Sequence, residues 1–155
     1  MKLSILITLL NEELVLAQTH KAISEQLESM ILSEELSDYE ILYVDDGSSD
    51  STLKLIDAIA DENPRVKYIS FSRNFGRESG ILAGFKYATG DAVMVMDGDL
   101  QHPPYLIPLF VEAYKEGYDI VSGQRSREGE SFVGSFFARS FYKFSNHSMD
   151  VKLTD

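Results

Sequence analysis

The stretch that decides the fold lies near the middle of the chain and reads Ala92-Val93-Met94-Val95-Met96-Asp97-Gly98-Asp99-Leu100-Gln101-His102-Pro103-Pro104. Residues 92–96 form an apolar run with the length of a buried strand. Such a strand places Asp97 at or near its carboxyl end, and in open α/β sheets ligands bind at that edge. The stretch therefore predicts a strand that delivers the following loop to a binding site.

This loop has two interpretations. Gly98 lets the backbone turn tightly enough for Asp97, Asp99 and the Gln101 amide to converge on one hard cation. A plain turn explains the same residues equally well, because Asp-Gly is a common turn pair and Pro103-Pro104 would end any element. On this stretch alone both interpretations stay open.

The whole chain has the size and composition of one domain. Its 155 residues, 44% of them hydrophobic, suit a single compact domain with a substantial core. Because it has no cysteine, a disulfide framework, a thiolate zinc site and a cysteine nucleophile are excluded. Its net charge of −11 argues against a general nucleic-acid-binding protein, since phosphate backbones need a basic surface.

The amino-terminal run lacks the pattern of a signal peptide. A lysine precedes apolar residues 3–10, but acidic Glu12 and Glu13 follow at once, without small residues that would mark a cleavage site. No apolar run approaches the roughly 20 residues of a membrane span. We therefore expect a first buried strand, in a chain that does not itself cross a bilayer.

Strands and helices are expected to alternate along residues 3–122. The predicted strands are Leu3–Leu9, Tyr39–Val44, Val66–Phe71, Ala92–Met96 and Tyr118–Ser122. The predicted helices run from about Glu12 to Leu32, from a cap at Ser49, Asp50 or Ser51 to Asn63, from Glu78 to Ala88 and from Tyr105 to Lys115.

Two glycines are expected to end helices: Gly90 as a left-handed cap, and Gly117 as a stop. Most of the predicted strands are continuously apolar, which is typical of strands buried on both faces. The predicted fold class is therefore α/β, with a mostly parallel sheet flanked by helices on both faces. Beyond Ser122 an aromatic helix, Phe132 to Phe144, is expected to pack in the core, because it has few cations for a membrane-surface helix.

Polar clusters follow three of the predicted strands. Asn11-Glu12 follows the first strand and Asp45-Asp46-Gly47-Ser48 the second, so both lie at the same sheet edge as Asp97 and Asp99. An Asp in such a loop can accept hydrogen bonds from a base or a ribose. Without a Gly-rich phosphate loop, a divalent cation held by Asp99 would supply the charge that a diphosphate needs.

Three competing sites fit the sequence less well. An EF-hand would need Gly at position 102 and Glu at position 108, which are His and Pro. An aspartyl-phosphate phosphatase would carry its acidic pair on an early strand, with a lysine and a second acidic pair further on. A serine nucleophile would need a Gly-x-Ser-x-Gly elbow, which the sequence lacks.

With these residues in view, the chain resembles the family 2 glycosyltransferases of the GT-A fold, in particular the bacterial polyprenyl-phosphate glycosyltransferases related to dolichol-phosphate mannose synthase. The resemblance covers nearly the whole chain. It depends on motifs that are weak singly but occur in family order, namely Leu10-Asn11-Glu12, Asp45-Asp46-Gly47-Ser48, Arg73-Asn74-Phe75-Gly76, Ala83-Gly84, Ala88-Thr89-Gly90-Asp91, Asp97 to Pro104, and Gly123-Gln124-Arg125.

The resemblance implies roles for residues of this chain. It implies a nucleotide pocket lined by Thr8, Asn11, Glu12, Asp45 and Asp46. It also implies that Mg²⁺ or Mn²⁺ is held against the donor diphosphate by Asp97, Asp99 and Gln101, and that the acceptor's phosphate meets Arg125 and Arg139. The residues expected to act in catalysis are Asp97, Asp99 and Arg125.

The chain departs from the family pattern at three places. Leu10 stands where a Tyr is usual, and His102 where an acidic residue is more usual. Relatives continue beyond the position of Asp155 into transmembrane helices, so residues 1–155 are expected to be one catalytic domain truncated at its carboxyl end. Within it, 1–122 would be the nucleotide-sugar-binding half and 123–155 the start of the acceptor region.

The reaction implied is an inverting, metal-dependent transfer of a sugar from a UDP- or GDP-sugar to a lipid phosphate such as polyprenyl phosphate, for cell-envelope glycan synthesis. The full-length protein is expected in the cytoplasm at the inner face of the membrane, and a homo-oligomer is compatible with the family. The alternatives are a noncatalytic nucleotide-sugar-binding module, an inactive fragment, or transfer to a sugar hydroxyl, for which a carboxylate base is required.

Overall fold

The computed structural model describes residues 1–123, of which Met1–Val121 form one compact unit. Its elements are β1 (Lys2–Leu9), α1 (Leu16–Leu32), β2 (Asp38–Asp45), α2 (Thr52–Glu62), β3 (Val66–Ser70), α3 (Arg77–Tyr87), β4 (Ala92–Asp97), the short 3-10 helix η1 (Pro104–Leu106) and α4 (Ile107–Lys115). The four strands form one sheet in the order β3-β2-β1-β4, and every pairing is parallel. The prediction of a parallel α/β sheet is confirmed.

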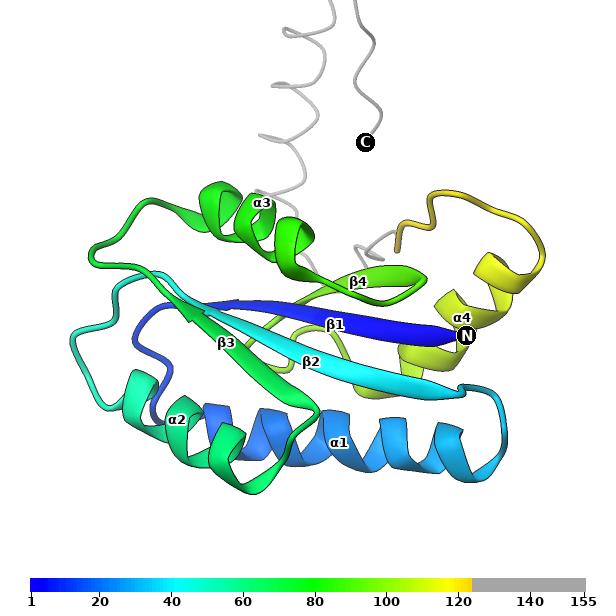
Figure 1. Ribbon diagram of the computed structural model, residues 1–155, viewed down its shortest axis with the longest axis horizontal. Helices are drawn as coiled ribbons and strands as arrows, with labels where there is room; N and C mark the ends of the chain where they lie inside the picture. The colour runs from blue at the N-terminus through cyan, green and yellow to red at the C-terminus, as the bar shows by residue number, and fades with distance from the viewer. Residues whose placement is uncertain (124–155) are drawn as a thin grey trace, which may run out of the picture. The chain divides into compact units, whose positions relative to one another are not determined.

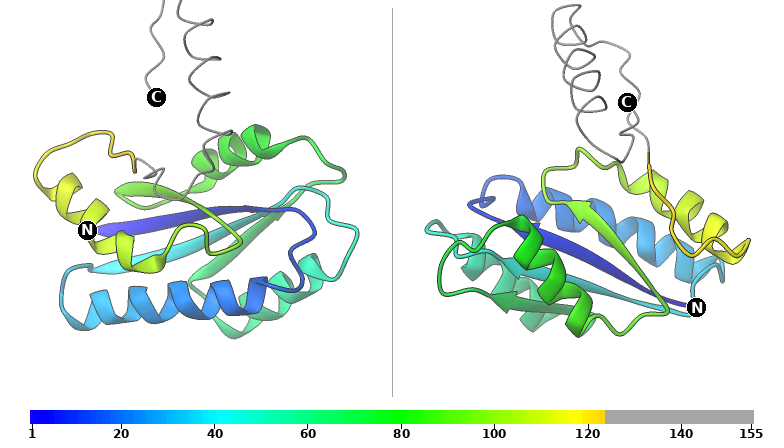
Figure 2. Two further views of the ribbon diagram at one scale, coloured as in Figure 1. Left: turned by 180° about the vertical axis from the view of Figure 1, so that it is seen from behind. Right: turned by 90° about the horizontal axis from the view of Figure 1, so that it is seen from above.

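Helices cover both faces of this sheet, as the apolar strands predicted. Figures 1 and 2 show α1 and α2 on one face and α3 on the other. The larger core joins alternate β1 residues such as Ile5 and Ile7 to α1, α2 and α4, whose Ile107 and Val111 are buried in it. The intervening side chains, among them Leu6, face α3 in a smaller core. Burial on both faces explains why β1 and β2 read as unbroken apolar runs.

The helix α3 lies very close to β1 because two glycines face the strand. A Cβ atom on Gly84 would lie 2.2 Å from Leu6 Cδ1, and one on Gly80 would lie 2.8 Å from Thr8 Cγ2. Glycine is therefore the residue that allows this approach of helix to sheet. The contact fixes the position of the first turn of α3 relative to the end of β1.

Two expectations about helix ends are wrong. The first helix begins at Leu16 and not near Glu12, where the backbone amides of Glu12 and Glu13 instead donate to Thr52 at the start of α2 and to Asp50 in the loop before it. Gly90 has no positive φ, since α3 ends with an extended Ala88. Gly90 is needed for space, because a Cβ there would lie 2.7 Å from Ser4 N. Gly117, with φ of 100°, does end α4 as expected.

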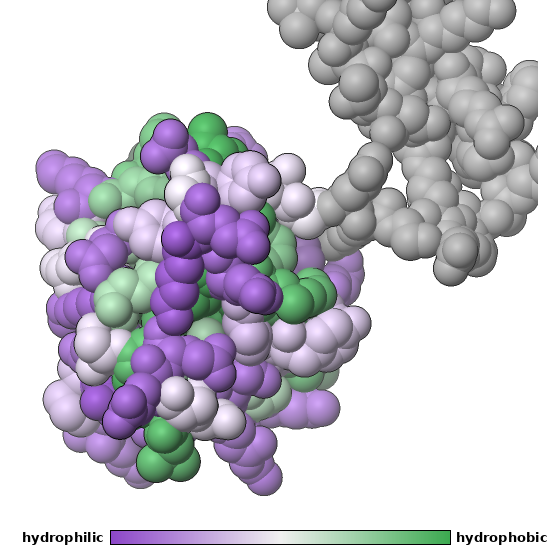
Figure 3. Space-filling model, turned by 90° about the vertical axis from the view of Figure 1, so that its right-hand side faces the viewer, coloured by the Kyte–Doolittle hydropathy of each residue, from purple (hydrophilic) through white to green (hydrophobic). Residues whose placement is uncertain are grey.

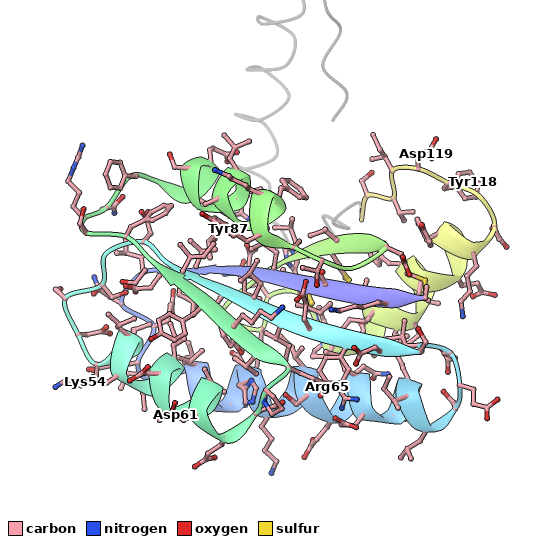
Figure 4. The ribbon with its side chains drawn as sticks, viewed as in Figure 1. Lys54, Asp61, Arg65, Tyr87, Tyr118 and Asp119 are labelled. Carbon is pink, nitrogen blue, oxygen red and sulfur yellow. The ribbon has the colours of Figure 1, made fainter. Side chains whose placement is uncertain are left out.

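The fifth strand predicted at Tyr118–Ser122 is also wrong. These residues have no strand pairing within residues 1–123, and the Ile120 side chain is 88% exposed. Tyr118 and Asp119 lie on the loop that follows α4 (Figure 4). An apolar composition suited to a strand is insufficient without a neighbouring strand to complete the ladder.

The surface around the amino ends of the strands is mostly hydrophilic, with scattered apolar patches (Figure 3). Within residues 1–123 no helix has the length and apolar character needed to cross a bilayer.

Candidate active site

Parallel pairing brings three polar loops to one edge of the sheet. Leu9 pairs with Asp45 across β1 and β2, and Thr8 pairs with Asp97 across β1 and β4. The carboxyl ends of these strands therefore lie together, at the left of Figure 1. The predicted juxtaposition of the three clusters at one edge is confirmed.

A cleft of about 270 Å³ lies at this edge. The residues that line it and were predicted as site residues are Thr8, Glu12, Asp46, Asp97 and Asp99. The other lining residues are Leu9, Leu10 and Gly98, and the three that the sequence motifs did not single out for a role, Asn74, Gly76 and Arg77. The cleft opens where the order of strands reverses, between β1 and β4, which is the usual ligand site of such sheets.

Asp97 ends β4, and within residues 1–123 it contacts the side chains of Arg77 and His102. Its Oδ1 atom accepts a hydrogen bond from Nη2 of Arg77, in the first turn of α3. Its backbone N–H donates to His102 Nδ1 over 3.1 Å, and His102 Nε2 lies 3.5 Å from Asp97 Oδ2. His102 therefore closes the loop back onto Asp97.

Asp99 is held by the residue two positions later. The Gln101 backbone N–H donates to Asp99 Oδ1 over 3.0 Å, and the Gln101 Nε2 donates to Oδ2 over 2.6 Å. Between them Leu100 has a φ of 62°, a conformation that is uncommon for a bulky residue. The loop is thus a hydrogen-bonded turn that also presents two carboxylates to the cleft, so the turn interpretation does not exclude a cation.

These carboxylates suit a cation that is shared with a ligand. Within residues 1–123 no group of three or more His, Cys, Asp or Glu side chains is arranged to hold a metal ion. Magnesium-like ions are usually bound by one or two carboxylates together with substrate phosphates. Asp97 and Asp99 carry oxygen atoms of the kind that such a cation prefers, and both residues line the cleft.

Asp45 and Asp46 have different surroundings. Asp46 lines the cleft, and its Oδ1 and Oδ2 accept the backbone N–H groups of Phe75 at 2.7 Å and Gly76 at 2.9 Å. Asp45 is 1% exposed, accepts bonds from Ser48 N and Ser70 Oγ, and does not line the cleft. Asp45 is therefore placed behind the site, and Asp46 both lines it and holds the loop before α3.

The loops after β1 and β2 are bonded to each other. Asn11 Oδ1 accepts the Ser49 N–H over 2.8 Å, and the Asn11 N–H donates to Ser48 Oγ over 2.9 Å. The Glu12 N–H donates to Thr52 Oγ1 over 2.8 Å. Asn11, with φ of 57°, thus braces the wall of the cleft without lining it.

Glu12 has a carboxyl whose pKa is raised by the surroundings of the cleft. Its partial burial raises the pKa of its carboxyl, and the nearby charges of Asp99 and Asp50 raise that pKa further. Since four carboxylate residues line the cleft, a cation or a basic side chain is needed before an anionic ligand can enter.

Gly98 separates the two carboxylates under a steric constraint. A Cβ on Gly98 would lie 2.4 Å from Cδ2 of the buried Leu9. We expect Gly98→Ala to lower the free energy of unfolding by about 1–3 kcal/mol in urea titrations, because overpacking shifts the loop or the strand.

The matched control is the same substitution in a Leu9→Ala background, where the space is free. There Gly98→Ala should change the free energy of unfolding by less than about 0.5 kcal/mol. Equal losses in both backgrounds would contradict steric contact with Leu9 as the cause.

Arg77 was missed by the sequence reasoning, although it directly follows the Arg73–Gly76 motif. Its partner Asp97 is twenty positions away, so the pairing depends on how α3 is placed on the sheet. The expected acceptor contacts Arg125 and Arg139 lie outside the described residues, as does the predicted helix from Phe132 to Phe144.

Comparisons with known proteins agree with this geometry. Residues 4–153 match the family model described as Glycosyl transferase family 2. The chain is 46% identical over 153 residues to CsbB of Bacillus subtilis (strain 168), named as a glycosyltransferase, covering 99% of this chain and 45% of that protein. It is 37% identical over 158 residues to the prophage bactoprenol glucosyl transferase homolog of Escherichia coli (strain K12), covering 100% of this chain and 49% of that protein. The chain spans about half the length of the curated relatives it matches.

A solved structure shares the fold. It is the mannosyltransferase PcManGT from Pyrobaculum calidifontis in complex with GDP-Man and Mn²⁺, with a TM-score of 0.53 and 20% sequence identity. The match covers 63% of this chain and 27% of that one. The architecture described above is therefore that of the GT-A glycosyltransferases.

Proposed function

The chain belongs to glycosyltransferase family 2, and from this premise we propose that it transfers a sugar from a nucleoside diphosphate donor to a polyprenyl phosphate. The observation that carries the proposal is the acidic cleft at the carboxyl ends of β1 and β4, where Asp97 and Asp99 lie beside Glu12 and Arg77. Relatives named bactoprenol glucosyl transferases support a polyprenyl acceptor.

The donor would lie in the cleft with its diphosphate toward Asp97 and Asp99. Mg²⁺ or Mn²⁺, held by Asp99 with Asp97 and the Gln101 amide, would offset the charge of the departing nucleoside diphosphate. Thr8, Glu12 and Asp46 would line the nucleotide side of the cleft. The Asn11 and Asp45 side chains would support this wall from behind.

The acceptor needs little activation. A phosphate oxygen of a polyprenyl phosphate is already anionic near neutral pH, so alignment matters more than a general base. That oxygen would form a bond to the sugar C1 while the bond from C1 to the donor's β-phosphate oxygen breaks. The leaving nucleoside diphosphate keeps the electron pair, and a single displacement inverts C1. Arg125 and Arg139 are proposed to meet the acceptor phosphate at the cytoplasmic membrane surface.

The test is a transfer assay on the chain with radiolabelled UDP-glucose, UDP-N-acetylglucosamine or GDP-mannose and a polyprenyl phosphate in detergent. We expect label to enter the organic phase with one of these donors, only with Mg²⁺ or Mn²⁺ present, and nucleoside diphosphate to be released in equal amount.

If calorimetry shows nucleotide binding while no donor gives lipid product, the chain is a noncatalytic nucleotide-sugar-binding module or an inactive fragment, and the proposed transfer by this chain is wrong. Product formed equally well in excess EDTA would overturn the assigned metal. Product from a sugar acceptor, but none from the lipid phosphate, would show transfer to a hydroxyl.

A further inference from the structure

We propose that Arg77 is a positioning residue that couples cation binding to diphosphate binding in the cleft. It would compete with the cation for Asp97, and then bind the diphosphate of the donor once the cation has displaced it. This inference rests on the proposed function, because it concerns the same nucleotide and cation.

Arg77 contributes a positive charge to a cleft that is otherwise lined by acidic and uncharged residues within residues 1–123. Among the described residues that line the cleft it is the one basic side chain, and it shares the lining with Glu12, Asp46, Asp97 and Asp99. A diphosphate brings further negative charge into this space. Its entry requires that the charge be offset, and within residues 1–123 Arg77 is the lining side chain that can do so together with a divalent cation.

The backbone of Arg77 is fixed from two sides. The Phe75 and Gly76 amides, directly before it, both donate to Asp46. The close contacts of Gly80 and Gly84 with β1 hold the rest of α3 against the sheet. The Cα atom of Arg77 is therefore held at the cleft. When the side chain changes conformation, its guanidinium stays close enough to reach a ligand in the cleft.

The side chain of Arg77 is held much less firmly than its backbone. It is 53% exposed in its ion pair with Asp97, whose side chain is 25% exposed. Ion pairs as exposed as this one add little stability, so a divalent cation can replace the guanidinium on Asp97 at small cost. The displaced guanidinium has a planar fork of donors that matches phosphate oxygens.

This arrangement predicts opposite effects on two ligands. Arg77→Met should bind Mn²⁺ alone about threefold more tightly, because the competing ion pair and the repulsion are removed. The same variant should bind UDP or GDP, in saturating Mn²⁺, about tenfold more weakly, because a charged hydrogen bond to phosphate is lost. The affinity of Arg77→Lys for the nucleotide should lie between those of the wild type and Arg77→Met.

The experiment measures free Mn²⁺ by electron paramagnetic resonance and nucleotide binding by calorimetry, with circular dichroism to show that each variant is folded. Lys86→Met is the matched control, since it removes one positive charge from the last turn of the same helix. It should leave both affinities within about twofold of the wild type.

The outcomes separate the inference from the proposed function. If wild-type protein binds neither Mn²⁺ nor nucleotide, the proposed function is wrong. If the wild type binds both, but Arg77→Met weakens both or changes neither, the proposed function stands and the coupling role of Arg77 is overturned. Effects of equal size in Lys86→Met would likewise overturn it, since they would reflect net charge alone.

Discussion

Asp99→Asn is expected to lower the rate of sugar transfer by about 10³-fold and the affinity for a nucleotide with Mn²⁺ by about 100-fold. Asparagine keeps the shape of the side chain and can still accept the Gln101 backbone N–H, but its amide nitrogen cannot accept the bond from Gln101 Nε2. It removes the charge that we propose holds the cation against the diphosphate. The measurements are the organic-phase transfer assay and calorimetry with Mn²⁺ at saturation.

Asp61→Asn is the matched control for this prediction. Asp61 is exposed on α2, away from the cleft edge (Figure 4), and its replacement makes the same change in net charge. It should leave rate and affinity within about twofold of the wild type. An Asp99→Asn protein that binds nucleotide with Mn²⁺ as tightly as the wild type would show that the cation is not held by this loop.

Glu40→Gln is expected to lower the free energy of unfolding at pH 7 by about 3 kcal/mol. Glu40 is 2% exposed, and it accepts hydrogen bonds from Ser4 Oγ at 2.6 Å, Lys67 Nζ at 2.8 Å and Thr89 N at 2.6 Å. Burial by itself raises the pKa of this carboxyl, but the bonds from Lys67, Ser4 and Thr89 outweigh it and lower the pKa from 4.5 to about 2. A glutamine amide nitrogen at this site would face donors instead of accepting from them.

The pH dependence of stability provides a second measure of the same group. Because the folded-state pKa of Glu40 lies below its unfolded value, its contribution is complete above pH 4.5 and is lost as the pH falls toward about 2. Urea titrations over this range should show a steeper loss in the wild type than in Glu40→Gln. The control is Glu25→Gln, whose side chain is 68% exposed beside Lys21, and which should cost less than about 0.5 kcal/mol. Parallel curves for wild type and Glu40→Gln would contradict the lowered pKa.

The position of the site could be predicted because it depends on few long-range contacts. Once β1, β2 and β4 are recognised as buried parallel strands, their carboxyl ends must share one edge, and the loops carrying Glu12, Asp46 and Asp97 meet there. The apolar runs, with the turn residues at their ends, are enough to predict that these strands end at one edge. The start of α1 could not be predicted in this way, because it is set by hydrogen bonds to residues some 40 positions later.

Arg77 could not be assigned from local sequence for a related reason. Its contact with Asp97 depends on how close α3 lies to β1, which is decided by the absence of side chains at Gly80 and Gly84. One local signal was present, however. A cation at the first position of a helix is unfavourable beside the helix dipole, and such local inconsistencies tend to mark functional positions.

The mutual bonding of the loops after β1 and β2 bears on the entropy of ligand binding. Asn11, Ser49 and Thr52 hold one wall of the cleft in place through bonds that need no ligand. A nucleotide that binds there loses little affinity to the ordering of this wall, since backbone freedom was given up when the domain folded. Within residues 1–123, the long and half-exposed side chain of Arg77 is a part of the cleft lining whose conformational freedom a ligand can still restrict.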